Sequence, residues 1–172
     1  TSNVNSMYQM FYGATSFNQN ISAWDTSNVT NFNGMFQSCA FNFCDDTNAD
    51  DFNQDISSWD TSSATDMSKM FLNQQAFNQD LSGWDVSSVN NMSGMFERAY
   101  SFNQDISNWD VSSVTNMSRM FSLAKIFNQD IGAWDVSSVI NMSHMFWIAQ
   151  AFNQDISAWD TSNVTNMQSL FK

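Results

Sequence analysis

Residues 102–117 read FNQDISNWDVSSVTNM, and the text SRMF follows at 118–121. The same text returns with small changes along nearly the whole chain, so this stretch is one unit of a repeat. Tryptophans mark the interval, because successive copies are 25 residues apart: Trp59, Trp84, Trp109, Trp134 and Trp159. A period of 20–50 residues is typical of chains built from stacked coils. The repeat therefore decides the expected fold class.

One interval in this series is longer than the others. Trp24 stands 35 residues before Trp59, so ten residues have been inserted once. The Met-Phe pairs place the insertion within residues 37–51, which also hold both cysteines. We expect a single domain over residues 1–172, made of 25-residue repeats with one irregular loop. Because the text TSNV opens the chain and recurs inside later repeats, we expect a fragment of a larger protein.

Each repeat contains two patterns of apolar residues. Over residues 89–102 the apolar spacing is three and four, which predicts one face of a short helix. Over residues 106–111, Trp109 and Val111 share a face opposite polar residues, which predicts a short strand. The expected fold is an α/β repeat solenoid, with seven helical segments on one face and a parallel sheet of six strands on the other. Asn103 and its copies are expected to form a ladder of amides between coils, because buried amides need hydrogen-bond partners.

Charge excludes several classes of partner. The formal net charge is −12, and only five residues are Lys or Arg. Such a chain cannot neutralise a phosphate backbone, so we expect no nucleic acid partner, and anionic membranes are disfavoured. No apolar run reaches the ~20 residues that span a bilayer, so this segment is expected not to insert into a membrane. Divalent cations, basic protein surfaces and neutral glycans stay open.

Two columns of aspartates form the candidate ligand face. The first column directly follows the repeated Trp and consists of Asp25, Asp60, Asp85, Asp110, Asp135 and Asp160. The second column precedes each expected strand and consists of Asp55, Asp80, Asp105, Asp130 and Asp155. In a structural interpretation, each carboxylate accepts hydrogen bonds from the backbone or from the Ser two residues on. In a functional one, the columns bind cations such as Ca²⁺ or a cationic partner.

The insertion carries two further candidates. Asp46, Asn48 and Asp50 alternate as the first ligands of a calcium loop do, although the glycine and the distal Glu of that motif are missing. They form a candidate Ca²⁺ site. Cys39 and Cys44 are close enough in sequence to form a disulfide at the base of the loop in an extracellular setting. A buried, reduced Cys39 is the alternative.

No set of acid, base and nucleophile stands out, so no enzyme is expected. His144 is the only histidine, and no nucleophile is tied to it. Several positions after the Met-Phe pairs vary from coil to coil, and a unique site would use residues that vary: Tyr12, Leu72, Glu97, Arg98, Leu123, Lys125, Trp147 and Ile148. Trp147 and Ile148 form either an exposed apolar spot or a contact between coils.

The pattern V-x-x-M-x-x-M-F-x-x-A-x-x-F at residues 89–102, followed by I-x-x-W-x-V at 106–111, resembles the BspA-like leucine-rich repeats. More narrowly, the text FNQDIS-x-WDVS-x-VT-x-M is similar to the signature of a bacterial surface-protein repeat family. The resemblance covers the chain except for the insertion. It implies a right-handed, leucine-rich-repeat-like solenoid within a secreted or surface-anchored protein, associated with adhesion and protein contacts. It implies no enzyme.

The expected function is a non-enzymatic surface recognition or adhesion module. It would present a repetitive acidic and polar strand face to a protein or glycan partner, at an extracellular or cell-surface location inferred from the resemblance. The alternatives are a structural spacer and a calcium-, ice- or mineral-binding repeat array. Because neither end carries a recognisable polar cap, end-to-end self-association also stays open.

Overall fold

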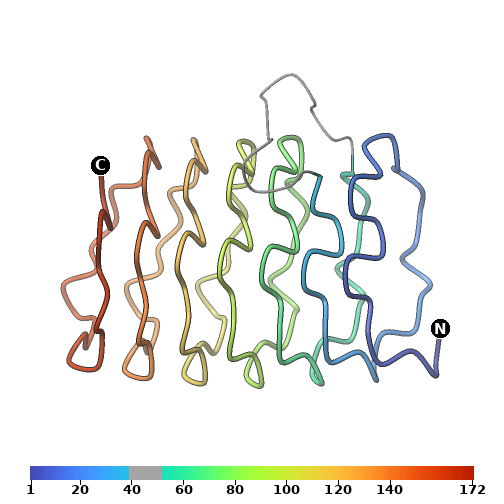
Figure 1. Cartoon of the computed structure of the whole chain (residues 1–172), viewed down its shortest axis with the longest axis horizontal. Helices are drawn as coiled ribbons and strands as arrows, with labels where there is room; N and C mark the ends of the chain where they lie inside the picture. The colour runs from blue at the N-terminus through green and yellow to red at the C-terminus, as the bar shows by residue number, and fades with distance from the viewer. Residues whose placement is uncertain (39–51) are drawn as a thin grey trace.

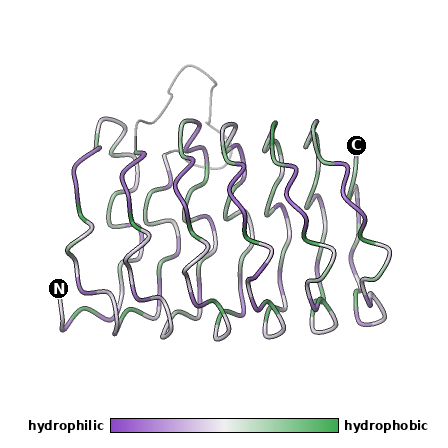
Figure 2. Ribbon diagram, turned by 180° about the vertical axis from the view of Figure 1, so that it is seen from behind, coloured by the Kyte–Doolittle hydropathy of each residue, from purple (hydrophilic) through white to green (hydrophobic). Residues whose placement is uncertain are grey.

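The chain is wound into a row of stacked coils. The computed structural model describes residues 1–38 and 52–172. Successive coils lie side by side along the long axis, with the N-terminus at one end and the C-terminus at the other (Figure 1). Hydrophobic and hydrophilic residues are interspersed along every coil (Figure 2), because each turn sends some side chains inward and others outward.

The expected α/β solenoid of leucine-rich-repeat type is wrong. Within residues 1–38 and 52–172 there is no helix, and parallel pairing is limited to isolated bridges in place of extended strands. The bridges join one position of each coil to its copy in the next coil: Ser6, Asn31, Asp66, Asn91, Asn116, Asn141 and Asn166. One further bridge joins Phe146 to Phe171. Neither the helical segments nor the six-stranded sheet is formed.

Consecutive turns replace the expected helix. The Met95 N–H donates to the Met92 carbonyl at 3.2 Å, a contact three residues back in place of four. Gly94 and Arg98 have φ angles of 63° and 60°, a left-handed conformation that an α-helix does not contain. The Gly94 N–H donates at 2.8 Å to the carbonyl of Ser118, in the next coil. The three-and-four spacing therefore arises from turns that bond between coils.

A turn also replaces the expected strand at residues 106–111. The Trp109 N–H donates to the Ile106 carbonyl at 3.2 Å, so the backbone bends at this point. The predicted division of faces is confirmed, because Trp109 and Val111 are buried whereas Asp110 is exposed. Alternation of side chains can thus follow from a series of turns as well as from a pleated strand.

Two columns of stacked phenylalanine rings form the centre of the core. In the first, successive ring centroids are 5.4–5.8 Å apart: Phe11, Phe36, Phe71, Phe96, Phe121, Phe146 and Phe171. In the second they are 6.1–6.2 Å apart: Phe17, Phe52, Phe77, Phe102, Phe127 and Phe152. The two columns meet at 3.9–4.0 Å between centroids. Stacked aromatic rings stabilise the fold beyond the contribution of apolar burial alone.

The repeated tryptophans connect neighbouring coils. The Trp109 Nε1–H donates to the Leu81 carbonyl at 3.0 Å, and the copies of this bond measure 3.1–3.2 Å. Their ring contacts within the described residues are with phenylalanines, such as Trp109 with Phe96, and not with one another. Like rings therefore stack in the Phe columns, whereas the repeated Trp rings pack against Phe.

The expected asparagine ladder is confirmed. The Asn103 Oδ1 accepts from the Asn128 N–H at 2.9 Å, and the Asn103 N–H donates to Asn78 Oδ1 at 2.9 Å. A glutamine beside each rung adds a second bond, because Gln129 Nε2 donates to the Asn103 carbonyl at 2.9 Å. Equivalent rungs join the coils from Asn18 to Asn153. Each rung gives the backbone N–H of one Asn a hydrogen-bond partner in the neighbouring coil, although no extended strand is present.

Candidate functional site

The first aspartate column consists of exposed carboxylates that close turns of the backbone. Asp110 Oδ1 accepts from the N–H of Ser112 at 3.1 Å and from its hydroxyl at 2.6 Å. The backbone bond recurs at 3.0–3.1 Å in all six coils of the column: Asp25, Asp60, Asp85, Asp110, Asp135 and Asp160. These are Asx turns, so each side chain is held by its own coil.

The second aspartate column repeats this arrangement one turn earlier. Asp105 Oδ1 accepts from the Ser107 N–H at 2.9 Å, and the copies of this bond measure 2.9–3.0 Å. Asp130 differs in that it accepts from the N–H of Gly132. Both columns are exposed along their whole length.

Hydrogen bonding favours the ionised form of several of these carboxylates. The side-chain and backbone bonds of Ser87 lower the pKa of Asp85 below its ordinary value, and those of Ser82 lower the pKa of Asp80. The negative charges of Asp55 and Asp105, in the neighbouring coils, oppose this fall in the pKa of Asp80. At Asp80 the bonds outweigh this repulsion, so its carboxylate keeps its charge near neutral pH beside those of Asp55 and Asp105.

A third column of Asx turns lies at the bridge position and was not anticipated. Asn116 Oδ1 accepts from the Ser118 N–H at 3.0 Å, and Asp66 Oδ1 accepts from the Ser68 N–H at 2.9 Å. The same bond recurs at Asn31, Asn91, Asn141 and Asn166. The signal in the sequence is the text D/N-x-S, which three of the repeats contain three times.

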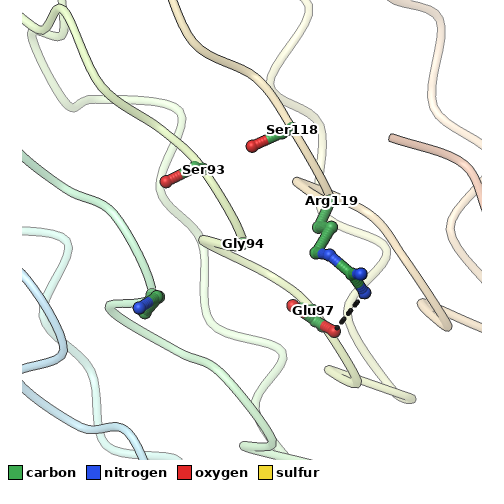
Figure 3. A pocket seen from close by; sticks show the side chains of 6 residues that line it. Ser93, Gly94, Glu97, Ser118 and Arg119 are labelled. Atoms are coloured by element: carbon green, nitrogen blue, oxygen red, sulfur yellow. Dashed lines mark ion pairs between the residues drawn. The ribbon is translucent and has the colours of Figure 1, made fainter. Parts of the chain in front are cut away.

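A polar hollow of about 180 Å³ breaks the regularity of the stack. It is lined by Lys69, Ser93, Gly94, Glu97, Ser118 and Arg119. Figure 3 shows Glu97 and Arg119 joined by an ion pair, with Ser93 and Ser118 on neighbouring coils beside them; Arg119 Nη1 lies 3.5 Å from Glu97 Oε1. The sequence marks Glu97 as variable, but the hollow itself was missed because its residues are spread over three repeats.

Glu97 is the only glutamate of the chain, and it is 6% exposed. Its Oε2 has no hydrogen-bond partner among the described residues. Burial raises the pKa of Glu97 to about 6, and the charges of Arg119, Arg98 and Lys69 oppose this shift. Three of the five Lys and Arg residues of the chain are thus gathered around one buried carboxyl group.

Gly94 makes room for that carboxyl group. A Cβ at this position would lie 3.3 Å from Glu97 Oε2, and its φ of 63° is one that glycine adopts without strain. An equivalent pair occurs at Gly34, where a Cβ would lie 3.1 Å from Oε1 of the buried Gln37. A long polar side chain therefore folds over a glycine at both places.

The chain matches one family model, described as Mycoplasma protein of unknown function, DUF285, over residues 1–104 and again over 74–172. The two matches together cover the whole chain. The chain belongs to the DUF285 family. The comparisons gave no match among curated proteins and none among solved structures. The DUF285 match is consistent with the resemblance to BspA-like repeats, and the description of the family assigns no activity.

Some of the predicted site residues of this DUF285 chain lie within the described residues, and others lie outside them. The aspartate columns are aligned, but no group of three or more His, Cys, Asp or Glu side chains within the described ranges could hold a metal ion. The candidate calcium ligands Asp46, Asn48 and Asp50, and the candidate disulfide Cys39–Cys44, lie outside the described residues. In the part that the structure describes, no helix is long and apolar enough to cross a membrane.

The remaining candidates lie one coil beyond Arg119. His144 is half-buried, and burial followed by the charges of Arg119 and Lys172 lowers its pKa. Its ring meets that of Trp147 edge-on, with centroids 6.5 Å apart. Trp147 and Ile148 are half-buried, which lies between the two alternatives of an exposed apolar spot and a buried contact between coils.

Proposed function

We propose that this chain is a non-enzymatic recognition module that binds a basic protein surface through its two aspartate columns. The observation that carries the proposal is the repeated Asx turn, which holds each carboxylate in place and, at positions such as Asp85, lowers its pKa. A partner would meet charges whose positions are already fixed, so little conformational entropy is lost when it binds.

The geometry favours a cationic protein over a neutral glycan. Carboxylates form charge-assisted hydrogen bonds with Lys and Arg, which are shorter and stronger than bonds to neutral hydroxyls. Parallel bridges set neighbouring coils about 4.8 Å apart, so one extended basic segment can engage several coils at once. Single exposed pairs contribute only ~0.2–1 kcal/mol, and affinity depends on their number.

A finer assignment is part of the same proposal. We place the chain among the BspA-like surface proteins, acting outside the cell in adhesion. This assignment rests on the repeat text and does not need the leucine-rich-repeat fold, which the turns rule out.

The test is binding to an immobilised oligolysine peptide at several salt concentrations. Replacing three adjacent carboxylates, Asp85→Asn, Asp110→Asn and Asp135→Asn, should weaken binding roughly tenfold at low salt. Asn preserves the turn, since Asn20 Oδ1 accepts from the Ser22 N–H at 2.9 Å in the first coil. High salt should reduce the difference by screening exposed charges.

The matched control makes the same three-charge change in the insertion, at Asp45, Asp46 and Asp51. It should bind the peptide about as tightly as the unmodified chain. Equal losses in both triple variants would show attraction to net charge alone and would refute recognition by the columns. Unchanged binding by the column variant would favour the structural spacer.

A further inference from the structure

The hollow is lined by a buried polar group that the fold itself does not use. Glu97 Oε2 is buried and has no hydrogen-bond partner among the described residues. A buried acceptor without a partner costs free energy, commonly ~1–3 kcal/mol. A buried oxygen of this kind at a hollow indicates that a bound molecule supplies the missing hydrogen bond.

We propose that this hollow binds a small hydroxylated carboxylate, of the sugar-acid class, at a site separate from the aspartate columns. The proposal goes beyond recognition of a basic protein, because it assigns the opposite charge preference to a different part of the surface.

The carboxylate of the ligand is assigned to Arg119 and Lys69. Both line the hollow, and together with Glu97 they give the lining a net charge of one positive unit. One monovalent anion neutralises that charge, whereas a dianion would exceed it. Arg119 has five N–H donors in a planar group whose geometry suits a carboxylate, and its side chain is 34% exposed. In a chain of net charge −12, this is a local exception to the acidic surface.

The hydroxyl groups of the ligand are assigned to Glu97, Ser93 and Ser118. Glu97 Oε2 can accept a hydrogen bond from a hydroxyl, which would satisfy the unpartnered atom. The hydroxyls of Ser93 and Ser118 can donate or accept. No aromatic or large apolar side chain lines the hollow, so it does not favour an apolar ligand. At about 180 Å³ it is smaller than the ~300–1,000 Å³ of pockets that enclose drug-sized molecules, so one monosaccharide-sized unit is the appropriate scale.

The repeat itself provides variants that should remove the cations without disturbing the backbone. Lys69 and Arg119 have φ angles of 58° and 60°, and the equivalent positions in two other coils are Gly34 and Gly94. Glycine adopts this conformation readily, so Lys69→Gly and Arg119→Gly should keep the turn. His144, one coil further with a φ of 59°, provides the matched control His144→Gly.

The experiment is ligand-observed NMR titration of the whole chain with D-glucuronate, D-glucose and acetate. D-glucuronate should bind at least roughly tenfold more tightly than the other two, because only it offers both a carboxylate and hydroxyls. Lys69→Gly and Arg119→Gly should each weaken its binding roughly tenfold or more. His144→Gly should stay within about twofold of the unmodified chain. Thermal melts establish that each variant folds, and Arg119→Gln replaces any glycine variant that does not.

Three results would overturn the proposal. Absence of D-glucuronate binding would leave water as the occupant of the hollow. Equal binding of D-glucose or acetate would refute the ligand class. Binding that survives both Lys69→Gly and Arg119→Gly would place the ligand elsewhere. None of these results bears on the aspartate columns, whose test uses a cationic peptide.

Discussion

At the scale of single residues, Glu97 is where the repeat departs from its own pattern. Most acidic residues in the described coils accept hydrogen bonds in exposed turns and have no need of a cation. Glu97 instead lies buried beside Arg119, with one oxygen unpartnered. The two environments have opposite effects, since hydrogen bonds lower the pKa of Asp85 while burial raises the pKa of Glu97.

Replacing Glu97 by Gln should remove one component of the pH dependence of stability. The pKa of Glu97 is about 6 in the folded chain, against 4.5 for an ordinary Glu. The folded state therefore holds its proton more tightly, and stability from this group is complete below pH 4.5 and is lost as pH rises through 6. Between pH 4.5 and 7 the unmodified chain should lose roughly 1–2 kcal/mol relative to Glu97→Gln. Denaturant melts at both pH values measure this difference.

Gln37 is the precedent for that substitution, because it is buried over Gly34 as Glu97 is over Gly94. If the unmodified chain and Glu97→Gln changed in stability by the same amount from pH 4.5 to 7, the assigned environment of Glu97 would be contradicted. Aspartates with a lowered pKa, such as Asp85, act in the other direction and at lower pH, since their contribution to stability is lost only as pH falls through that lowered pKa.

At the scale of the turn, the sequence predicts the side-chain partners better than the backbone. The Asx interpretation of Asp110 and Ser112 and the ladder at Asn103 both follow from residue chemistry, and both are present. Helix and strand were wrong because periodicity reports only which side chains face inward. Left-handed φ angles at Arg98 and Leu123, where no glycine stands, leave no trace in an apolar pattern.

Asn103→Ala should cost about 1–3 kcal/mol of stability. Asn103 Oδ1 accepts from both Asn128 N–H and Gln129 Nε2, so its loss leaves the Asn128 N–H without this acceptor, while Gln129 Nε2 keeps its bond to the Asn103 carbonyl. Asn153→Ala is the matched control, because Asn153 contributes only its backbone N–H to the last rung. That variant should change stability by less than about 0.5 kcal/mol. Equal losses in chemical denaturation would mean that the ladder does not join the coils.

At the scale of the whole molecule, repetition gives two kinds of information. Positions that recur in every coil, such as the Phe columns and the Asn ladder, bury surface and satisfy hydrogen bonds along the stack. Their copies could be read from the sequence because each coil contacts its neighbours in the same way. The hollow could not, since Lys69, Glu97 and Arg119 meet only when three coils are stacked.

The central claim is that the two aspartate columns act as one array toward a cationic partner. It is tested most directly by an amide NMR titration with oligolysine, because the Ser N–H bonded to each carboxylate reports on that carboxylate. We predict that the amides of Ser87, Ser112 and Ser137 shift together, and that Asp85→Asn, Asp110→Asn and Asp135→Asn reduce those shifts at the same peptide concentration. Shifts of undiminished size in the triple variant, or shifts that avoid both columns, would contradict the account.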